Sequence, residues 1–275
     1  MGWPPYRVAV RRKYLGIAGG VAGLVALGGI IVWSAMRPAA LGLEQPRIVL
    51  TSGEVSVDGS RIRVAQVLPP GATLRTGHGN ACFSVHASRV CVGANAEAVL
   101  SELGAATATI QATRGTFIAA SAGDELRLVM PGGAGAVVVR VATVAIEEVG
   151  TPNPAVRALD GNVTVQSTGQ PEVVLTAPGV IGQRDGKKRP PATTLEAEER
   201  AVVQLAGSWQ GSAGSIIQVE GLRGRVDVDG AEIGLAPAAV LVVEGTHTLI
   251  VRDSGRETTH ESLKLTAGQK LVRGG

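Results

Sequence analysis

The sequence predicts a mostly β protein, in which antiparallel β modules follow one N-terminal transmembrane helix. Aromatic residues are only 3% of the chain and glycine reaches 38 of 275 residues, so a core must be built from small aliphatic side chains. Short segments in which apolar and polar residues alternate, often ending at Asp-Gly or Pro-Gly, recur from residue 46 onward. This composition favours several small β modules over one large core.

The transmembrane helix is predicted at residues 15–36, LGIAGGVAGLVALGGIIVWSAM, which have no charge. A helix of about 20 apolar residues spans a bilayer. The basic residues that precede this segment are Arg7, Arg11, Arg12 and Lys13. Only Arg37 follows it closely, so residues 1–14 are expected in the cytoplasm and the bulk of the chain outside. The spacing of the glycines also allows two such helices to associate.

A second interpretation of the N-terminus stays open. RRKYLG, residues 11–16, resembles a twin-arginine export signal, and cleavage after such a signal would release the protein. The apolar run is long for a signal, however, and no Ala-x-Ala cleavage site ends it. We therefore expect a retained single-pass anchor in a bacterial inner membrane, with the bulk of the chain in the periplasm.

The charge distribution argues against a nucleic-acid partner. Four of the 26 basic residues lie before the predicted span, which leaves 22 basic residues against 23 acidic ones in the remainder. A nucleic-acid groove needs concentrated positive charge on the folded part. No nucleic-acid binding is predicted.

A β-hairpin is predicted after a linker over residues 37–45, in the segment ACFSVHASRVCVG at 81–93. With His86-Ala87 as the turn, Cys82 faces Cys91 across the two strands. The side chains that share the expected core face are Phe83, Val85, Val90 and Val92. The other face, expected to be more polar, has Cys82, Ser84, Arg89 and Cys91.

This register predicts a disulfide between Cys82 and Cys91. Opposed cysteines on paired strands lie close enough to bridge, these two are the only thiols of the chain, and the expected compartment is oxidising. The alternative is two free thiols below a loop.

Four segments in residues 46–168 then resemble, in their order, the FecR-type domain. They are LTSGEVSVDG, LPPGATLRTGHGNACFSVHASRVCVG, ATRGTFIAA and VRALDGNVTVQSTG. The resemblance implies an extracytoplasmic β domain, and the best-known members relay an envelope signal to a cytoplasmic sigma factor. Residues 1–14 are too few for a sigma-binding domain. The resemblance therefore implies a binding or signal-receiving module.

The next segment, residues 169–193, is predicted to be a linker because it is polar and contains Pro190-Pro191. Thr193 and Glu196 have the spacing of a capping box. A short amphipathic helix is therefore expected over residues 194–210.

The C-terminal segment, residues 217–273, resembles the PEGA domain through VDVDGAEIGLAP and the later VEGTHTLIVRDSG. This resemblance implies a small β-sandwich of the kind found in bacterial envelope proteins. Asp229-Gly230 is the expected tight turn of its first hairpin.

No catalytic residue, cofactor site or metal site is predicted. The four histidines, His78, His86, His247 and His260, are widely separated in sequence. Asp227 and Asp229 are expected on one face of a strand, as solvent-facing charges on a sheet edge. There is also no Gly-x-Ser-x-Gly elbow. The chain is not expected to be an enzyme.

The sequence thus predicts a non-enzymatic, membrane-anchored extracytoplasmic protein of the bacterial cell envelope, a binding or scaffold protein. Its β modules are expected to bind a protein or a cell-wall polysaccharide. The alternative is a FecR-like signal-receiving transmembrane regulator that relays an envelope signal to a cytoplasmic or membrane partner.

Overall fold

The computed structural model describes residues 45–151, 154–182, 188–189 and 214–274. The predicted transmembrane helix at 15–36, its flanking basic residues and the predicted amphipathic helix at 194–210 lie outside these ranges. No helix within the described ranges is long and apolar enough to cross a membrane.

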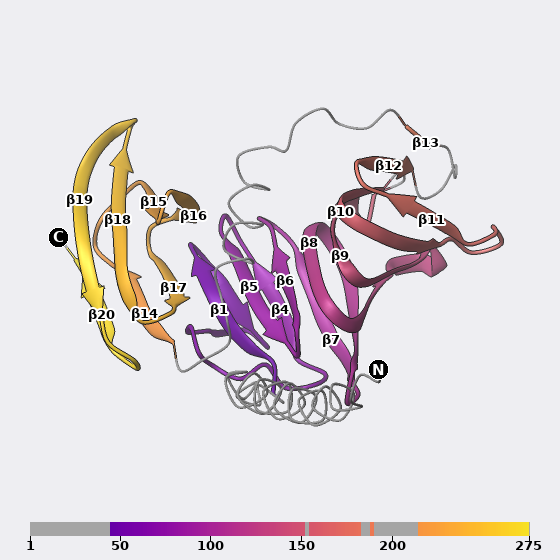
Figure 1. Cartoon of the computed structure of the whole chain (residues 1–275), viewed down its shortest axis with the longest axis horizontal. Helices are drawn as coiled ribbons and strands as arrows, with labels where there is room; N and C mark the ends of the chain where they lie inside the picture. The colour runs from indigo at the N-terminus through magenta and orange to yellow at the C-terminus, as the bar shows by residue number, and fades with distance from the viewer. Residues whose placement is uncertain (1–44, 152–153, 183–187, 190–213, 275) are drawn as a thin grey trace, which may run out of the picture. The chain divides into compact units, whose positions relative to one another are not determined.

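The described residues form twenty β-strands and one short 3-10 turn, η1 (Figure 1). The elements before residue 150 are β1 (Arg47–Ser52), β2 (Val55–Val57), β3 (Ser60–Arg61), β4 (Thr73–Thr76), β5 (Asn80–Val85), β6 (Ser88–Val92), β7 (Glu97–Leu103), β8 (Thr107–Met130), η1 (Pro131–Gly133) and β9 (Gly135–Val149). The later strands are β10 (Ala155–Gln166), β11 (Val173–Thr176), β12 (Gly179–Gly182), β13 (Lys188–Arg189), β14 (Ser215–Val219), β15 (Arg225–Val228), β16 (Ala231–Leu235), β17 (Ala238–Val242), β18 (Gly245–Asp253), β19 (Arg256–Leu265) and β20 (Lys270–Arg273).

Most strands belong to one sheet whose main path runs β13-β12-β10-β9-β8-β6-β5-β1-β17-β14-β20. Its pairings are antiparallel except for β14 with β20. A second antiparallel sheet has the order β16-β15-β18-β19. The mostly β, antiparallel class predicted from the sequence is confirmed.

The sequence motif Gly-x-Val-x-Val occurs three times, beginning at Gly53, Gly161 and Gly224, and its valines lie in three strands. The valines of all three copies are buried: Val55 and Val57 in β2, Val163 and Val165 in β10, Val226 and Val228 in β15. Two valines separated by one residue point to one face of a strand. The motif therefore supplies inward-facing aliphatic side chains to the sheets.

Strands from the two ends of the described sequence meet in the large sheet, because β1 pairs with β5 on one side and with β17 on the other. Leu50 lies opposite Val240 in the second of these pairings. Gly53 N–H also donates to the carbonyl of Pro237 at 2.8 Å, and Ser52 Oγ donates to the carbonyl of Leu235 at 2.7 Å. The C-terminal segment is thus joined to the earlier strands by backbone hydrogen bonds.

Gly234 in β16 is required by the same junction. Its φ is +126°, and a Cβ built there would lie 2.2 Å from Ser52 Oγ. Only glycine adopts this backbone conformation and leaves this space. The residue therefore lets β16 approach β1 closely.

Two hydrophobic cores lie on opposite faces of the central strands. Phe83, Phe117 and Ile146 belong to the larger core. The second core contains Leu50 and Ile118 from the central strands together with side chains of the C-terminal segment, among them Val226. Strands β5 and β6 are consequently buried on both faces.

The prediction of a linker over residues 169–193 is wrong in its first half. Strands β11 and β12 lie there, and both pair with β10. The turn between them contains Pro178, and the apolar side chains of Leu175 and Ile181 are buried. The short apolar runs VVLT and GVIG form strands although the sequence around them is polar, because their buried side chains complete the large core.

We expect Val240→Ala to lower the free energy of unfolding by roughly 2 kcal/mol, because two buried methyl groups leave a cavity. Val240 is 3% exposed and lies in the second core. Hydrogen exchange of the full chain should then quicken in β5 and β6 as well as in β15 and β18. Val141→Ala is the matched control, since Val141 is 70% exposed. Loss of protection in β15 and β18 alone would contradict a shared core.

Candidate functional site

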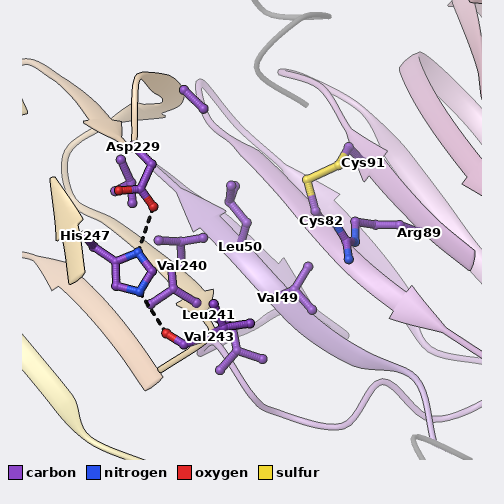
Figure 2. A pocket seen from close by; sticks show the side chains of 13 residues that line it. Val49, Leu50, Cys82, Arg89, Cys91, Asp229, Val240, Leu241, Val243 and His247 are labelled. Carbon is purple, nitrogen blue, oxygen red and sulfur yellow. Dashed lines mark hydrogen bonds and ion pairs between the residues drawn. A yellow bond between two sulfur atoms is a disulfide. The ribbon is translucent and has the colours of Figure 1, made fainter. Parts of the chain in front are cut away.

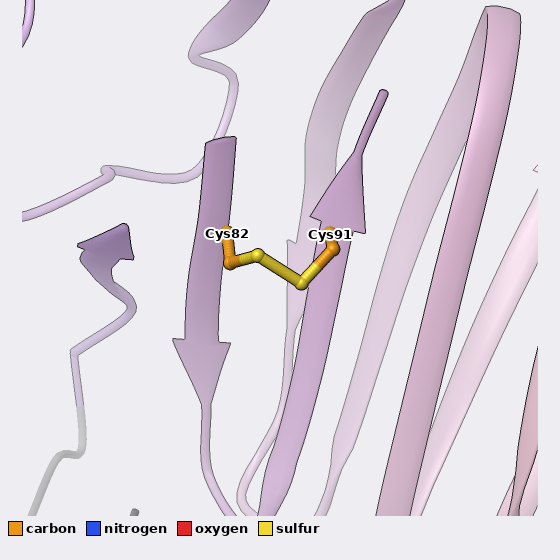
Figure 3. Close-up of a disulfide and its surroundings, with 2 residues drawn as sticks. All are labelled: Cys82 and Cys91. Atoms are coloured by element: carbon orange, nitrogen blue, oxygen red, sulfur yellow. A yellow bond between two sulfur atoms is a disulfide. The ribbon is translucent and has the colours of Figure 1, made fainter. Parts of the chain in front are cut away.

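The hairpin β5–β6 has the register predicted from its sequence. Cys82 pairs with Cys91 and Phe83 with Val90, and the turn residue His86 has a φ of 50°. The backbone N–H of Ala87 in the turn donates to Asp124 Oδ2 at 2.8 Å. The two cysteines form a disulfide with an S–S distance of 2.08 Å (Figure 3).

The face of this hairpin that includes the disulfide is not a polar surface, which corrects the expectation from the sequence. Cys82, Ser84, Arg89 and Cys91 are all less than 9% exposed. Both cysteines belong to the second core, which includes side chains from the C-terminal segment. The alternation of side chains was predicted correctly, but the covering sheet comes from about 140 residues farther along the chain.

A pocket of about 190 Å³ lies beside the disulfide, between the two sheets. One wall comes from β1, β5, β6 and β17, and the other comes from β15, β16, β18 and the adjoining turn (Figure 2). The lining side chains are mostly aliphatic. They are Val49, Leu50, Val228, Ala231, Val240, Leu241, Val242 and Val243, together with the disulfide and the polar residues Arg89, Asp229 and His247.

Arg89 is the basic residue of the hairpin wall. It is 8% exposed, and burial lowers the pKa of its guanidinium to about 10. The guanidinium is still protonated at neutral pH. Burial of a charge is costly in free energy, so a cation in a mostly aliphatic wall is an unusual feature of this pocket.

His247 and Asp229 form the polar end of the pocket on the other wall. His247 Nδ1 lies 2.7 Å from Asp229 Oδ2, and Nε2 lies 2.8 Å from the carbonyl of Val243. The backbone N–H of Thr248 donates to Asp229 Oδ1 at 2.8 Å. His247 is 6% exposed, so these contacts satisfy a buried ring.

The prediction that Asp227 and Asp229 are solvent-facing charges on a sheet edge is wrong for the edge and for Asp227, whereas the side chain of Asp229 is 49% exposed. Strand β15 lies between β16 and β18 and is not a sheet edge. Asp227 is 6% exposed and forms an ion pair with Arg252 of the neighbouring strand β18. Asp229 is instead a turn residue with a φ of 53°. Charged residues on a strand favour the prediction of an exposed edge. The sequence does not show that Arg252 pairs with Asp227 and so allows its carboxylate to be buried.

The structure brings together only part of the residues that the sequence analysis named. Cys82 and Cys91 line the pocket. The basic residues that predict the membrane orientation lie outside the described ranges, and they are Arg7, Arg11, Arg12 and Lys13. Within those ranges no three His, Cys, Asp or Glu side chains are close enough to hold a metal ion.

Three polar residues of the pocket were not predicted as a site. Arg89, Asp229 and His247 are far apart in sequence, and each also fits an ordinary strand or turn. The one local indication is Arg89, which lies between the buried residues Ser88 and Val90 in a short strand.

Comparisons with known proteins add a distant similarity. No family model and no curated protein matches the chain. Two crystal structures of a putative anti-sigma factor from Parabacteroides distasonis ATCC 8503 are similar, at 14% and 13% sequence identity with TM-scores of 0.39 and 0.38. Each alignment covers 48% of this chain and 64% of the other, so the match spans less than two thirds of that protein. This level of similarity does not transfer that protein's described role, and the FecR-type and PEGA resemblances stay predictions.

Removal of the disulfide by Cys82→Ala with Cys91→Ala should lower the free energy of unfolding by about 2–3 kcal/mol, because the bond constrains a short loop of the unfolded chain. Denaturant unfolding of the full chain measures this loss. Alkylation of the unaltered protein checks that the disulfide is present. No thiol should be labelled before reduction, and two should be labelled after reduction in denaturant. A thiol labelled without reductant would contradict the buried disulfide.

His247→Ala should lower the free energy of unfolding by about 1–3 kcal/mol, because it leaves the carbonyl of Val243 and the carboxylate of Asp229 without the ring that is hydrogen-bonded to both. His260→Ala is the matched control, since its side chain is 60% exposed and its loss should change stability by less than about 0.5 kcal/mol. Equal losses in the two variants, measured by denaturant unfolding, would show that the His247 contacts contribute little.

Proposed function

We propose that this protein is a non-enzymatic, extracytoplasmic binding or scaffold protein of the bacterial cell envelope, anchored to the inner membrane through residues 15–36. Its two β modules bind a protein or a cell-wall polysaccharide partner. The observation that carries the proposal is the disulfide-containing junction at which the two modules share a sheet and a core.

The disulfide supports the extracytoplasmic placement. Disulfides form and persist in oxidising compartments and are rare in the cytosol. Cys82 and Cys91 are the only cysteines of the chain, and their bond lies inside the second core. The basic residues before the predicted span point to the same orientation, with the modules outside the cytoplasm.

The junction supports a binding or scaffold role. Because β1 has backbone partners on both sides, the C-terminal strands are fixed to the earlier ones by a continuous sheet. Surfaces held in a fixed arrangement lose little conformational freedom when a partner binds. Such a body is suited to hold a partner near the membrane.

The alternative function is a signal-receiving transmembrane regulator. The order of the FecR-like segments over residues 46–168 favours it, because the best-known proteins with such segments relay an envelope signal inward. In that case residues 1–14 would contact a cytoplasmic or membrane partner.

Site-specific crosslinking of the full chain in native membranes tests the proposal. A photoreactive residue replaces Val174 in one variant and Val272 in another, since both valines are exposed and lie in different strands, β11 and β20. Envelope proteins or wall fragments should be captured from one or both positions, and a replacement at the buried Ile217 is the control that should capture nothing.

A parallel variant with residues 1–14 scrambled and their charges kept distinguishes the two functions. Unchanged envelope partners support the scaffold role. Capture of a sigma factor or another cytoplasmic regulator from a crosslinker within residues 1–14, lost on scrambling, would overturn that role in favour of the regulator.

A further inference from the structure

A second hollow, with a volume of about 260 Å³, shares no lining residue with the pocket beside the disulfide. It is lined by β1, β14, β17 and β20 together with the segment around β3. Its charged lining residues are Arg61, Arg63, Lys270 and Glu220, which give it a net charge of +2. Because basic and acidic residues are nearly balanced in the chain beyond the predicted span, this excess is local, and we call the site the basic hollow.

The segment after β2 places two guanidinium groups at the basic hollow. Ile62 and Val64 are 5% and 9% exposed and belong to the larger core, whereas Arg61 and Arg63 are exposed. Successive side chains of an extended chain point to opposite sides. The two apolar residues therefore anchor the segment, and the two arginines share its other side.

The floor of the basic hollow is a row of paired residues in the large sheet. Thr51 lies opposite Ala239, and Ala239 lies opposite Gln218. Lys270 lies opposite Ile216, two residues before Gln218 in β14. Paired residues of neighbouring strands have their side chains on the same face, as do residues i and i+2 of one strand. A hydroxyl, an amide and an ammonium group consequently share this face of the sheet.

The three cations of the basic hollow lack a carboxylate partner within the described residues. No ion pair or side-chain hydrogen bond in that part of the chain involves Arg61, Arg63 or Lys270. Glu220 instead accepts a hydrogen bond from Gln218 Nε2. An anion that enters the hollow therefore meets three cations and displaces no ion pair.

The polar groups of the hollow select for two kinds of ligand group. A guanidinium binds a carboxylate through two parallel hydrogen bonds. An ionised carboxylate such as Glu220 only accepts, and the amide of Gln218 can both donate and accept. A ligand with carboxylates alone is repelled by Glu220, whereas hydroxyl groups can donate to it. The lining thus suits a ligand in which a carboxylate and several hydroxyl groups occur together.

We propose that the basic hollow binds a sugar acid, the carboxylate-bearing unit of an acidic polysaccharide. Its carboxylate lies on Arg61 and Arg63, and its hydroxyl groups face Gln218 and Glu220. The volume of about 260 Å³ is below the roughly 300–1,000 Å³ of pockets for drug-sized ligands, which limits the bound part to a short saccharide. The proposal rests on the binding role given above, for which it names a class of partner.

Calorimetric titration of the full chain in phosphatidylcholine nanodiscs tests the proposal, with empty nanodiscs as the blank. The probes are digalacturonate, its neutral methyl ester, and the acetylated and amidated dipeptide Glu-Glu, which has two carboxylates and no hydroxyl group. Digalacturonate should bind one per chain, about tenfold more tightly than either analogue, because only it makes both kinds of contact. Raising the salt concentration from about 50 to about 200 mM should weaken binding of digalacturonate and leave the ester unchanged.

Substitutions of the cations show whether the charge of the hollow is recognised. Arg61→Gln with Arg63→Gln should lower the affinity for digalacturonate about tenfold and leave that for the ester unchanged. Lys270→Gln should lower it about threefold. The matched control is Arg256→Gln with Lys264→Gln, which removes the same charge from exposed positions of β19 outside the hollow and should bind like the unaltered protein.

Glu220→Gln tests the contact with the hydroxyl groups. It removes both the repulsion of the acidic dipeptide and an acceptor for the sugar, so the preference for digalacturonate over the dipeptide should fall from about tenfold to about threefold. An unaltered preference would overturn the placement of the hydroxyl groups at Glu220.

The same titrations can overturn the proposal as a whole. No heat above the blank with digalacturonate, equal binding of the acid and its ester, or unaltered affinity in the double variant Arg61→Gln, Arg63→Gln would each do so. Tighter binding of the dipeptide than of digalacturonate would assign the hollow to an acidic peptide instead. If the double variant does not fold, as judged by thiol labelling without reductant, Arg61→Gln alone decides the question through a loss of about threefold.

Titration with galacturonate, the single unit, separates two sources of the ligand. Tighter binding of digalacturonate assigns the hollow to a polysaccharide, and equal binding assigns it to a free sugar acid. Capture of an envelope partner by crosslinking without any binding of digalacturonate would overturn this inference alone. Binding of digalacturonate without a captured partner would overturn the envelope role alone.

Discussion

The structure depends on β1 having hydrogen-bonded neighbours on both sides. Its pairing with β5 continues the earlier strands, and its pairing with β17 brings in the C-terminal segment. A strand with two partners leaves no row of open backbone groups at the junction. Because the sheet continues across it, the second sheet, β16-β15-β18-β19, can cover a face of the central strands that would otherwise meet solvent.

The covered face explains the composition of the hairpin β5–β6. Strands buried on both faces need apolar or small side chains at successive positions, and β5 and β6 contain little else. Arg89 is the exception, since it is almost fully buried in the same layer as the disulfide.

The junction also fixes the two modules relative to each other through backbone hydrogen bonds, and it encloses the pocket between its two sheets.

The sequence by itself determined the β class, the hairpin of residues 81–93 with its turn at His86-Ala87, and the Cys82–Cys91 disulfide. These features depend on alternation and turn residues, which act between residues close in sequence. Only the tertiary structure decided that residues 169–182 add two strands, that β15 is central, and that the disulfide face is buried beside Arg89, Asp229 and His247. Each of these features depends on which distant strand covers a given face of the sheet. Local patterning does not specify that strand, because a polar or charged residue fits a solvent-exposed edge as well as a buried position where it pairs with a distant residue.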